Sequence, residues 1–391
     1  MIERPASLAA AALFLTLTCA AAPPLANAPP PPAIQPGNTV WLEPTRAQVH
    51  PQGNAEKQAQ MVSGRILPTP ELLQPEVDAT LPAYHPTPGL TISKTFRAGS
   101  SDILPGLVEA WSAAFRAYHP GFQLELVRPL AGSLGAVELI KGNLDLVFVS
   151  RELRPSDMAG FREHYHYDPL SIPVSGGSWR QFGFLDAVPV IVNPANPVQH
   201  LSFAQLDAAF STTRHRGLRP AQTWGDLGLA GAWARHKVHL YGIKPWNGYE
   251  EFMRQRVLST PGHRGEWRAD IHYDETFFNL ARRVAADPDA LGYSGLSAID
   301  SAVKIVPVSV ERDGQGVSPS YEAVAAARYP LARVTYLNTN IAPGTAPDPA
   351  LSEFIRFILS REGQAVVRAQ GILLPLRAQQ AAASMTLLPH P

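Results

Sequence analysis

Short apolar strands alternate with helices in the first part of the ordered chain, and this order restricts the fold more than any other feature. Residues 90–96, 122–127 and 144–149 are expected to form strands, because their apolar side chains alternate or follow one another without a break. Residues 104–118 carry apolar side chains at helical spacing, and residues 135–141 form a second expected helix. Strands and helices in this order, joined by short loops, are typical of a mostly parallel α/β sheet.

A second block with the same character follows. Its strands and helices are expected, in chain order, at residues 188–192, 202–210, 238–241, 246–258, 277–286, 303–310, 334–337, 351–359 and 363–370. A chain of 391 residues is long enough for two such bodies.

The first residues have the features of an export signal. Residues 8–22 are almost entirely apolar or small, a length that suits the hydrophobic region of a signal peptide and is short for a membrane-spanning helix. Ala26-Asn27-Ala28 follows the small-residue pattern of a cleavage site. We therefore expect a signal peptide over residues 1–28 and a periplasmic protein. A lipid anchor on Cys19 and a retained N-terminal anchor are the alternatives.

Proline is concentrated in the next segment. Of the 38 prolines in the chain, fifteen lie between residues 23 and 88. Proline removes a backbone donor and fixes φ, so this density excludes helices and central strands over most of the segment. Residues 29–89 are therefore expected to form an extended Pro-rich N-terminal arm.

Composition excludes several classes of protein. Lys and Arg total 33 and Asp and Glu total 33, so the formal net charge is zero, which argues against a nucleic-acid partner. The single cysteine excludes a disulfide framework and a cysteine-cluster metal site. No spacing marks a catalytic carboxylate pair, a nucleophile elbow or a phosphate-binding Walker loop. The sequence therefore favours a protein that is not an enzyme and has no cofactor or resident metal.

Small and hydroxyl-bearing residues follow several of the expected strands. They are Gly99, Ser100 and Ser101, then Gly132, Ser133 and Gly135, then Ser150 and Arg151, and finally Asn247, Gly248 and Tyr249. Ligands of open α/β sheets bind beyond the carboxyl ends of the strands, and helix N-termini there offer free N–H groups to an anion. Serine and glycine are also ordinary residues before a helix. The residues alone therefore indicate an exported α/β protein whose loops suit a small oxyanion.

A series of segments in a fixed order over residues 90–376 carries a resemblance to a known family. These segments are Gly99-Ser100-Ser101, Ala131-Gly132-Ser133, Ser150-Arg151-Glu152-Leu153, Asn193-Pro194-Ala195-Asn196-Pro197, Thr223-Trp224-Gly225-Asp226-Leu227, Leu291-Gly292-Tyr293-Ser294-Gly295, Tyr329-Pro330-Leu331-Ala332-Arg333 and Ser360-Arg361-Glu362-Gly363-Gln364. In this order the chain resembles the phosphate-binding proteins of bacterial ABC phosphate importers.

The resemblance implies a periplasmic binding protein-like fold with two lobes, mixed sheets and a hinge. Lobe 1 would comprise residues 90–187 and 306–378, lobe 2 residues 188–305, and residues 379–391 a tail. Phosphate or a related oxyanion would be held between the lobes by a monomeric protein, which would deliver it to an ABC permease of the inner membrane. The implied phosphate-binding residues are Ser100, Ser101, Gly132, Ser133, Ser150, Arg151, Asn247, Gly248 and Tyr249.

One loop departs from the family pattern. Asn247-Gly248-Tyr249 stands where the family usually has a Ser-Gly-Thr run, which leaves open a reshaped pocket or another ligand. The alternative function is an exported scaffold of the same family that binds a partner or another phosphorylated ligand without transport. A phosphatase-like activity on the same fold is a more distant alternative.

Three further segments offer alternatives. His164, His166 and Asp168 would share one face if they lay on a strand, where they could bind a metal, although a polar loop is the simpler interpretation. Residues 175–178 suit a lid or a hinge loop as well as an ordinary turn. Arg214, His215 and Arg216 form a basic cluster that suits a solvated face better than a partner contact.

Overall fold

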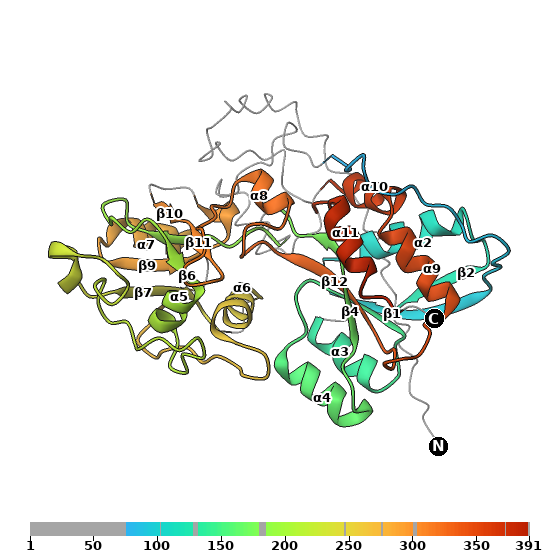
Figure 1. Cartoon of the computed structure of the whole chain (residues 1–391), viewed down its shortest axis with the longest axis horizontal. Helices are drawn as coiled ribbons and strands as arrows, with labels where there is room; N and C mark the ends of the chain where they lie inside the picture. The colour runs from blue at the N-terminus through green and yellow to red at the C-terminus, as the bar shows by residue number, and fades with distance from the viewer. Residues whose placement is uncertain are drawn as a thin grey trace, which may run out of the picture. The chain divides into compact units, whose positions relative to one another are not determined.

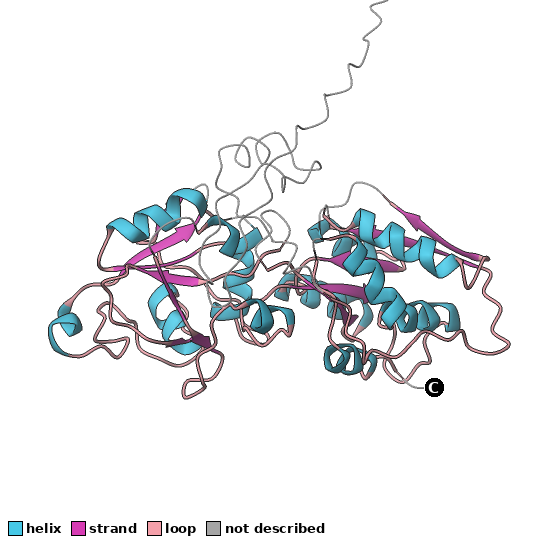
Figure 2. Cartoon of the chain, turned by 90° about the horizontal axis from the view of Figure 1, so that it is seen from above, coloured by secondary structure: helices cyan, strands magenta, loops and turns pink. Residues whose placement is uncertain are grey.

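The computed structural model describes residues 76–101, 103–127, 132–179, 185–245, 248–274, 277–299, 303–371 and 373–389. The expected signal peptide with Cys19, and residues 29–75 of the expected arm, lie outside these residues. The described part contains two five-stranded sheets, each packed against helices (Figure 1, Figure 2). None of the described helices combines the length and the apolar character that crossing a membrane requires.

The first sheet has the strand order β2-β1-β3-β12-β4. Its strands are β1 (Lys94–Ser100), β2 (Phe122–Leu126), β3 (Leu146–Val149), β4 (Leu170–Gly176) and β12 (Val334–Thr339). The strand β1 is parallel to β2 and β3, whereas β12 is antiparallel to both β3 and β4. The helices that accompany this sheet are α2 (Pro105–Arg116), α3 (Gly132–Ile140), α4 (Pro155–Tyr165), α9 (Pro349–Ile358), α10 (Arg361–Ala369) and α11 (Ala378–Met385). Trp111, Phe148 and Phe354 belong to the buried apolar cluster between them.

The second sheet has the order β10-β5-β9-β7-β8. Its strands are β5 (Val190–Val192), β7 (His239–Ile243), β8 (His272–Asp274), β9 (Ala290–Tyr293) and β10 (Lys304–Val306). The helices of this part are α5 (Phe203–Phe210), α6 (Gly248–Met253) with a π-helical turn (Arg254–Leu258), α7 (Phe277–Ala286) and α8 (Tyr321–Ala325). Two short 3-10 turns (Gly231–Arg235, Leu296–Ala298) and a parallel pair, β6 (Leu201–Ser202) with β11 (Val308–Ser309), complete it. Its core contains Trp224, Phe210 and Tyr293.

Both sheets follow the same plan, in which one strand is antiparallel to its two neighbours and lies second from an edge. In the first sheet this strand is β12, which the chain reaches only after the second sheet is complete. In the second sheet it is β5, the first strand after the chain leaves β4. In each sheet, this antiparallel strand is the first one that the chain forms after it passes over from the other sheet.

The two crossings are bonded to each other. The N–H of Gly177 donates to the carbonyl of Arg333 at 2.7 Å, and the N–H of Val188 donates to Leu331 at 3.1 Å. A Cβ on Gly177 would lie 2.3 Å from the carbonyl oxygen of Leu185, so only glycine fits where these segments meet.

The α/β class with mixed sheets is confirmed, with corrections to individual elements. The strand expected at 90–96 is β1 at Lys94–Ser100. The single strand expected at 303–310 is wrong: it divides into β10 and β11 at Pro307, whose missing N–H cannot take part in a ladder. The helix expected at 246–258 is α6 followed by the π-helical turn. The strands β4, β8 and β9 are additional to the elements expected from the sequence.

The described end of the Pro-rich segment, residues 76–89, packs on the first sheet's core through Leu81 and Tyr84. The hydroxyl of Tyr84 donates to Glu353 at 2.7 Å, so the bond of 2.8 Å between Tyr84 and His119 requires Nε2 of His119 to be the donor. Glu353 also accepts from the N–H and the hydroxyl of Thr87, at 3.0 and 2.8 Å. A buried carboxylate therefore attaches this segment to α9.

This attachment predicts a loss of stability in acid. Burial lowers the pKa of His119, so the unfolded chain binds a proton below about pH 6.5 while the folded state stays neutral. Burial raises the pKa of Glu353, but the bonds from Tyr84 and Thr87 and the charge of Arg356 lower it overall, so its contribution is lost below about pH 4.5. Melting curves across pH should show both steps. His119→Gln, which keeps a donor to Tyr84, should lack the upper step, and an unchanged upper step would assign it to other groups.

Candidate functional site

Two serines meet at the carboxyl ends of β1 and β3. The N–H of Ser101 donates to the carbonyl of Phe148 at 2.8 Å, which continues the parallel pairing beyond the strands. The hydroxyl oxygen of Ser101 lies 3.2 Å from the N–H of Ser150 and 3.4 Å from its hydroxyl. Ser100 and Ser101 are buried and Ser150 is half-buried. Because the Ser101 oxygen accepts both bonds, its own proton remains available to a ligand.

The helix α3 packs on β3 and β1, and Gly132 and Ser133 are its first two residues. The structure describes their backbone and not the side chain of Ser133. The first N–H groups of a helix have no partner within the helix and carry partial positive charge. Gly132 and Ser133 therefore carry backbone N–H groups that the helix itself does not use.

Arg151, directly after Ser150, is buried. Its Nη1 donates to the carbonyl of Glu152 at 2.7 Å and lies 3.5 Å from Asp157. Its Nη2 has no hydrogen-bond partner among the described residues. Burial lowers the pKa of this guanidinium, which Asp157 and Glu251 partly offset. Arg151 thus bonds within its own loop and keeps one nitrogen free.

Arg333 lies at the same edge of the sheet, although it was not among the expected site residues. Its Nη2 donates to the carbonyl of Ser150 at 3.4 Å. Its guanidinium carbon lies 5.2 Å from the ring centre of Tyr249 and 4.6 Å from that of Phe252, both on α6. Arg333 therefore links the serine pair to the element that carries Gly248 and Tyr249.

Tyr249 is buried and its hydroxyl donates to the carboxylate of Asp186. Asp186 also accepts from the N–H and the hydroxyl of Ser297, at 2.8 and 2.7 Å. Full burial raises the pKa of Asp186 to about 6, although the bonds from Ser297 and the charge of Arg333 act in the opposite direction and lower it. The phenol expected to face a ligand is thus bonded to an internal carboxylate. Gly248 is exposed at the start of α6, and Asn247 lies outside the described residues.

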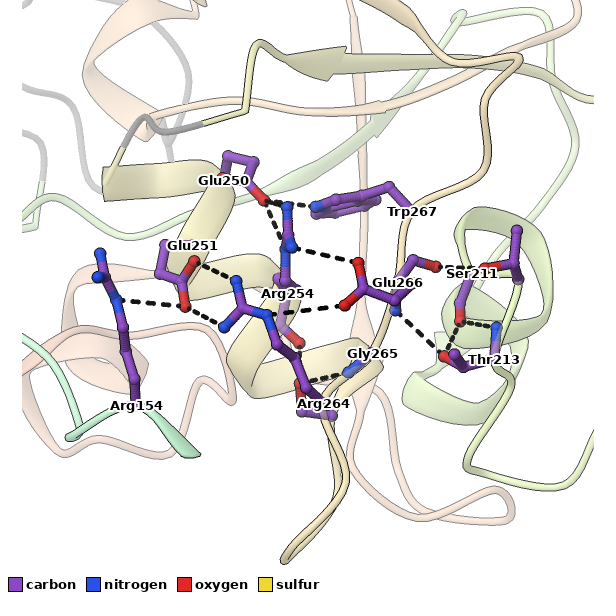
Figure 3. Close-up of polar contacts among 12 residues, drawn as sticks. Arg154, Ser211, Thr213, Glu250, Glu251, Arg254, Arg264, Gly265, Glu266 and Trp267 are labelled. Carbon is purple, nitrogen blue, oxygen red and sulfur yellow. Dashed lines mark hydrogen bonds and ion pairs between the residues drawn. The ribbon is translucent and has the colours of Figure 1, made fainter. Parts of the chain in front are cut away.

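Acidic residues in the first turn of α6 are balanced by arginines (Figure 3). Glu250 pairs with Arg254 at 2.6 Å and accepts from the indole of Trp267 at 2.5 Å. Both oxygens of Glu251 accept from Arg264 at 3.0 Å, and Arg154 lies 3.6 Å from the same carboxylate. These ion pairs neutralise two buried carboxylates on the helix that carries Tyr249.

The metal alternative at His164, His166 and Asp168 is wrong in its premise. These residues do not form a strand: His164 lies in the last turn of α4, and His166 ends that helix in the left-handed conformation. Asp168 instead forms a hydrogen bond of 2.9 Å with Arg162. Helical geometry therefore separates the three side chains that a strand would have aligned.

The structure also shows where residues 175–178 and the basic cluster at 214–216 lie. Ser175 and Gly176 belong to β4 and pair with β12, whereas Gly177 and Ser178 follow β4 in the crossing and donate to the carbonyls of Arg333 and Leu185. Arg216 donates to the carbonyls of Val257 and Arg256, at 2.6 and 3.0 Å, so it caps the end of the π-helical turn. The solvated-face interpretation is therefore wrong for Arg216.

Residues 85–362 match the PBP superfamily domain. The Phosphate-binding protein PstS of Pseudomonas aeruginosa is 28% identical over 306 residues, which cover 78% of this chain and 90% of that protein. The Phosphate-binding protein PstS of Staphylococcus aureus is 22% identical over 281 residues, which cover 71% of this chain and 77% of that protein.

The fold also resembles a solved structure, the crystal structure of PstS from Borrelia burgdorferi. The TM-score is 0.50 at 16% identity, and the match covers 73% of this chain and 99% of that one. This likeness concerns the fold alone. Because the matched domain spans most of the sequence and the described part has the two mixed sheets set out above, the chain belongs to the PBP superfamily.

Proposed function

We propose that this protein binds inorganic phosphate reversibly and delivers it to an ABC importer of the inner membrane. The observation that carries the proposal is the meeting of Ser101 and Ser150 at the carboxyl ends of two parallel strands, beside buried Arg151. Hydroxyl and guanidinium donors in a desolvated setting suit a tetrahedral oxyanion, and reversible capture needs no covalent step. The P. aeruginosa and S. aureus relatives, both phosphate-binding proteins, support phosphate as the ligand.

Under this proposal the ligand also meets Ser100, Gly132 and Ser133, as the family resemblance implies. Asn247, Gly248 and Tyr249 would approach it from the second sheet. The lobe boundaries at 90–187 with 306–378 and at 188–305, the monomeric state, the signal peptide and the periplasmic location remain predictions. Closure of two lobes on the ligand would remove water and strengthen each hydrogen bond.

Removing one hydroxyl should weaken binding measurably. A hydrogen bond donated to a charged ligand contributes about 1.5–3 kcal/mol, so Ser150→Ala should raise the dissociation constant for phosphate about tenfold to a hundredfold. Isothermal titration calorimetry of the wild type with phosphate, sulfate and a phosphate monoester would first identify the preferred ligand. Ser352→Ala, on α9, is the matched control and should bind as the wild type does.

The outcome that contradicts the proposal is equally direct. A wild-type protein that gives neither heat nor a thermal shift with any of the three ligands at millimolar concentration is not a phosphate carrier. Ser150→Ala binding phosphate as tightly as the wild type would place the ligand away from this edge of the first sheet.

A further inference from the structure

Arg333 is a buried cation with incomplete hydrogen bonding. It is 5% exposed, and its Nε and Nη1 have no partner among the described residues. Its hydrogen bond from Nη2 to the carbonyl of Ser150 is long at 3.4 Å. A guanidinium carries five N–H donors and no acceptor. Three of the five, one on Nε and two on Nη1, therefore have no described partner.

Such a group is costly to keep. Burying a charge without full hydrogen bonding is unfavourable, and replacing it with an apolar side chain of similar volume often leaves a protein as stable or makes it more stable. The faces of Tyr249 and Phe252 and the charge of Asp186 compensate in part. Burial lowers the pKa of Arg333 to about 10, so the side chain remains charged at neutral pH. The unpaired donors are therefore part of a cation that is present when the protein functions.

The backbone fixes where this cation lies. Arg333 directly precedes β12, which is antiparallel to β3, and Tyr336 pairs with Val149. The amino end of β12 consequently meets the carboxyl end of β3, where Ser150 lies. The N–H of Gly177 donates to the carbonyl of Arg333, and a Cβ on Gly177 would lie only 2.7 Å from that of Arg333. The crossing segments thus hold Arg333 against the serine pair.

We infer that Arg333 is the charged ligand of the oxyanion at the Ser101–Ser150 pair, where its unpaired N–H groups find their acceptors. This inference rests on the proposed function and specifies it. Arg151 supplies the second buried guanidinium of the same edge, with one nitrogen also free. A guanidinium at the serine pair favours a doubly charged tetrahedral anion over a singly charged one.

The test separates ligand binding from structural support. Arg333→Met keeps apolar volume against the two aromatic rings and removes the charge. It should weaken phosphate binding a hundredfold or more in calorimetry, while the melting temperature without phosphate stays the same or rises. Arg333→Lys should keep that melting temperature and still bind at least tenfold more weakly, because an ammonium lacks the planar set of donors. Arg256→Met is the matched control, because Arg256 is half-exposed and paired with Glu152 at 3.0 Å; its phosphate affinity should be unchanged.

The contrary outcomes are distinct from failure of the proposed function. If the wild type binds phosphate and Arg333→Met binds it within threefold of the wild type, the inference is wrong and the proposed function stands. If Arg333→Met loses affinity only together with a lower melting temperature in the absence of phosphate, Arg333 has a structural role and the inference is wrong. If the wild type binds none of the three anions, the proposed function itself fails.

Discussion

Glu353→Ala is expected to destabilise the protein by about 3–5 kcal/mol, because it removes one partner of a buried charged network. The side chain of Glu353 is 3% exposed and accepts from Tyr84, Thr87 and Arg356 at 2.6–3.0 Å. Alanine would leave the Tyr84 hydroxyl and two groups of Thr87 without this acceptor. Urea denaturation monitored by circular dichroism would measure the change in unfolding free energy.

An exposed ion pair between β1 and the N-cap of α9 provides the control. Lys94 and Asp348 lie 3.0 Å apart, but the lysine side chain is 50% exposed. Lys94→Ala should therefore change the unfolding free energy by about 1 kcal/mol or less. A Glu353→Ala variant no less stable than Lys94→Ala would show that residues 76–89 contribute little to the folded state.

Tyr249→Thr, the change that restores the family's usual residue, is expected to cost about 3–5 kcal/mol of stability, since it removes a buried aromatic ring. The ring packs under Arg333, and its hydroxyl supplies one of the hydrogen bonds to buried Asp186. Tyr249→Phe keeps the ring and removes only that donor, which should cost about 1–3 kcal/mol. Thermal and urea denaturation of both variants would separate the two contributions.

Phosphate affinity should fall in the same order, with a larger loss for Tyr249→Thr than for Tyr249→Phe. If the family pocket is kept, the sequence predicts that threonine at position 249 preserves or improves phosphate binding, because it restores the family's hydroxyl and relieves bulk; if the pocket is remade, it predicts no phosphate site. The structure predicts the reverse, because Arg333 would lose one of its two aromatic contacts and Asp186 a donor. Tyr249→Thr binding phosphate more tightly than the wild type would contradict this view of the pocket.

The periodicity of the sequence was sufficient for most of the fold, and it failed where pairing is decided by distant residues. The helix at residues 277–286 and the strand that begins at residue 334 were expected and observed. By contrast, the strand expected at residues 90–96 begins only at Lys94 and continues to Ser100, because pairing with β2 and β3 sets its limits. The sequence pattern shows which residues are apolar, whereas the ends of a strand depend on the neighbouring strands with which it pairs.

The same distinction explains the candidate site. Ser101 and Ser150 could be expected because ligands lie beyond the carboxyl ends of parallel strands. Arg333 could not be predicted by this rule, because it precedes an antiparallel strand whose amino end lies at that edge. Asp186 could not be predicted either, because the residues next to it in the sequence do not indicate its partners, Tyr249 and Ser297.

Because β12 is translated after the whole second sheet, the first sheet cannot be completed until late in synthesis. Translation proceeds from the N-terminus, and β12 lies between β3 and β4 in the first sheet. Until residues 334–339 leave the ribosome, β3 and β4 each have an unpaired edge where β12 will lie. The second sheet has all its strands by residue 306. The half of the protein synthesised first is therefore the last to be completed, and a chain that stops before residue 334 leaves two open strand edges to aggregate.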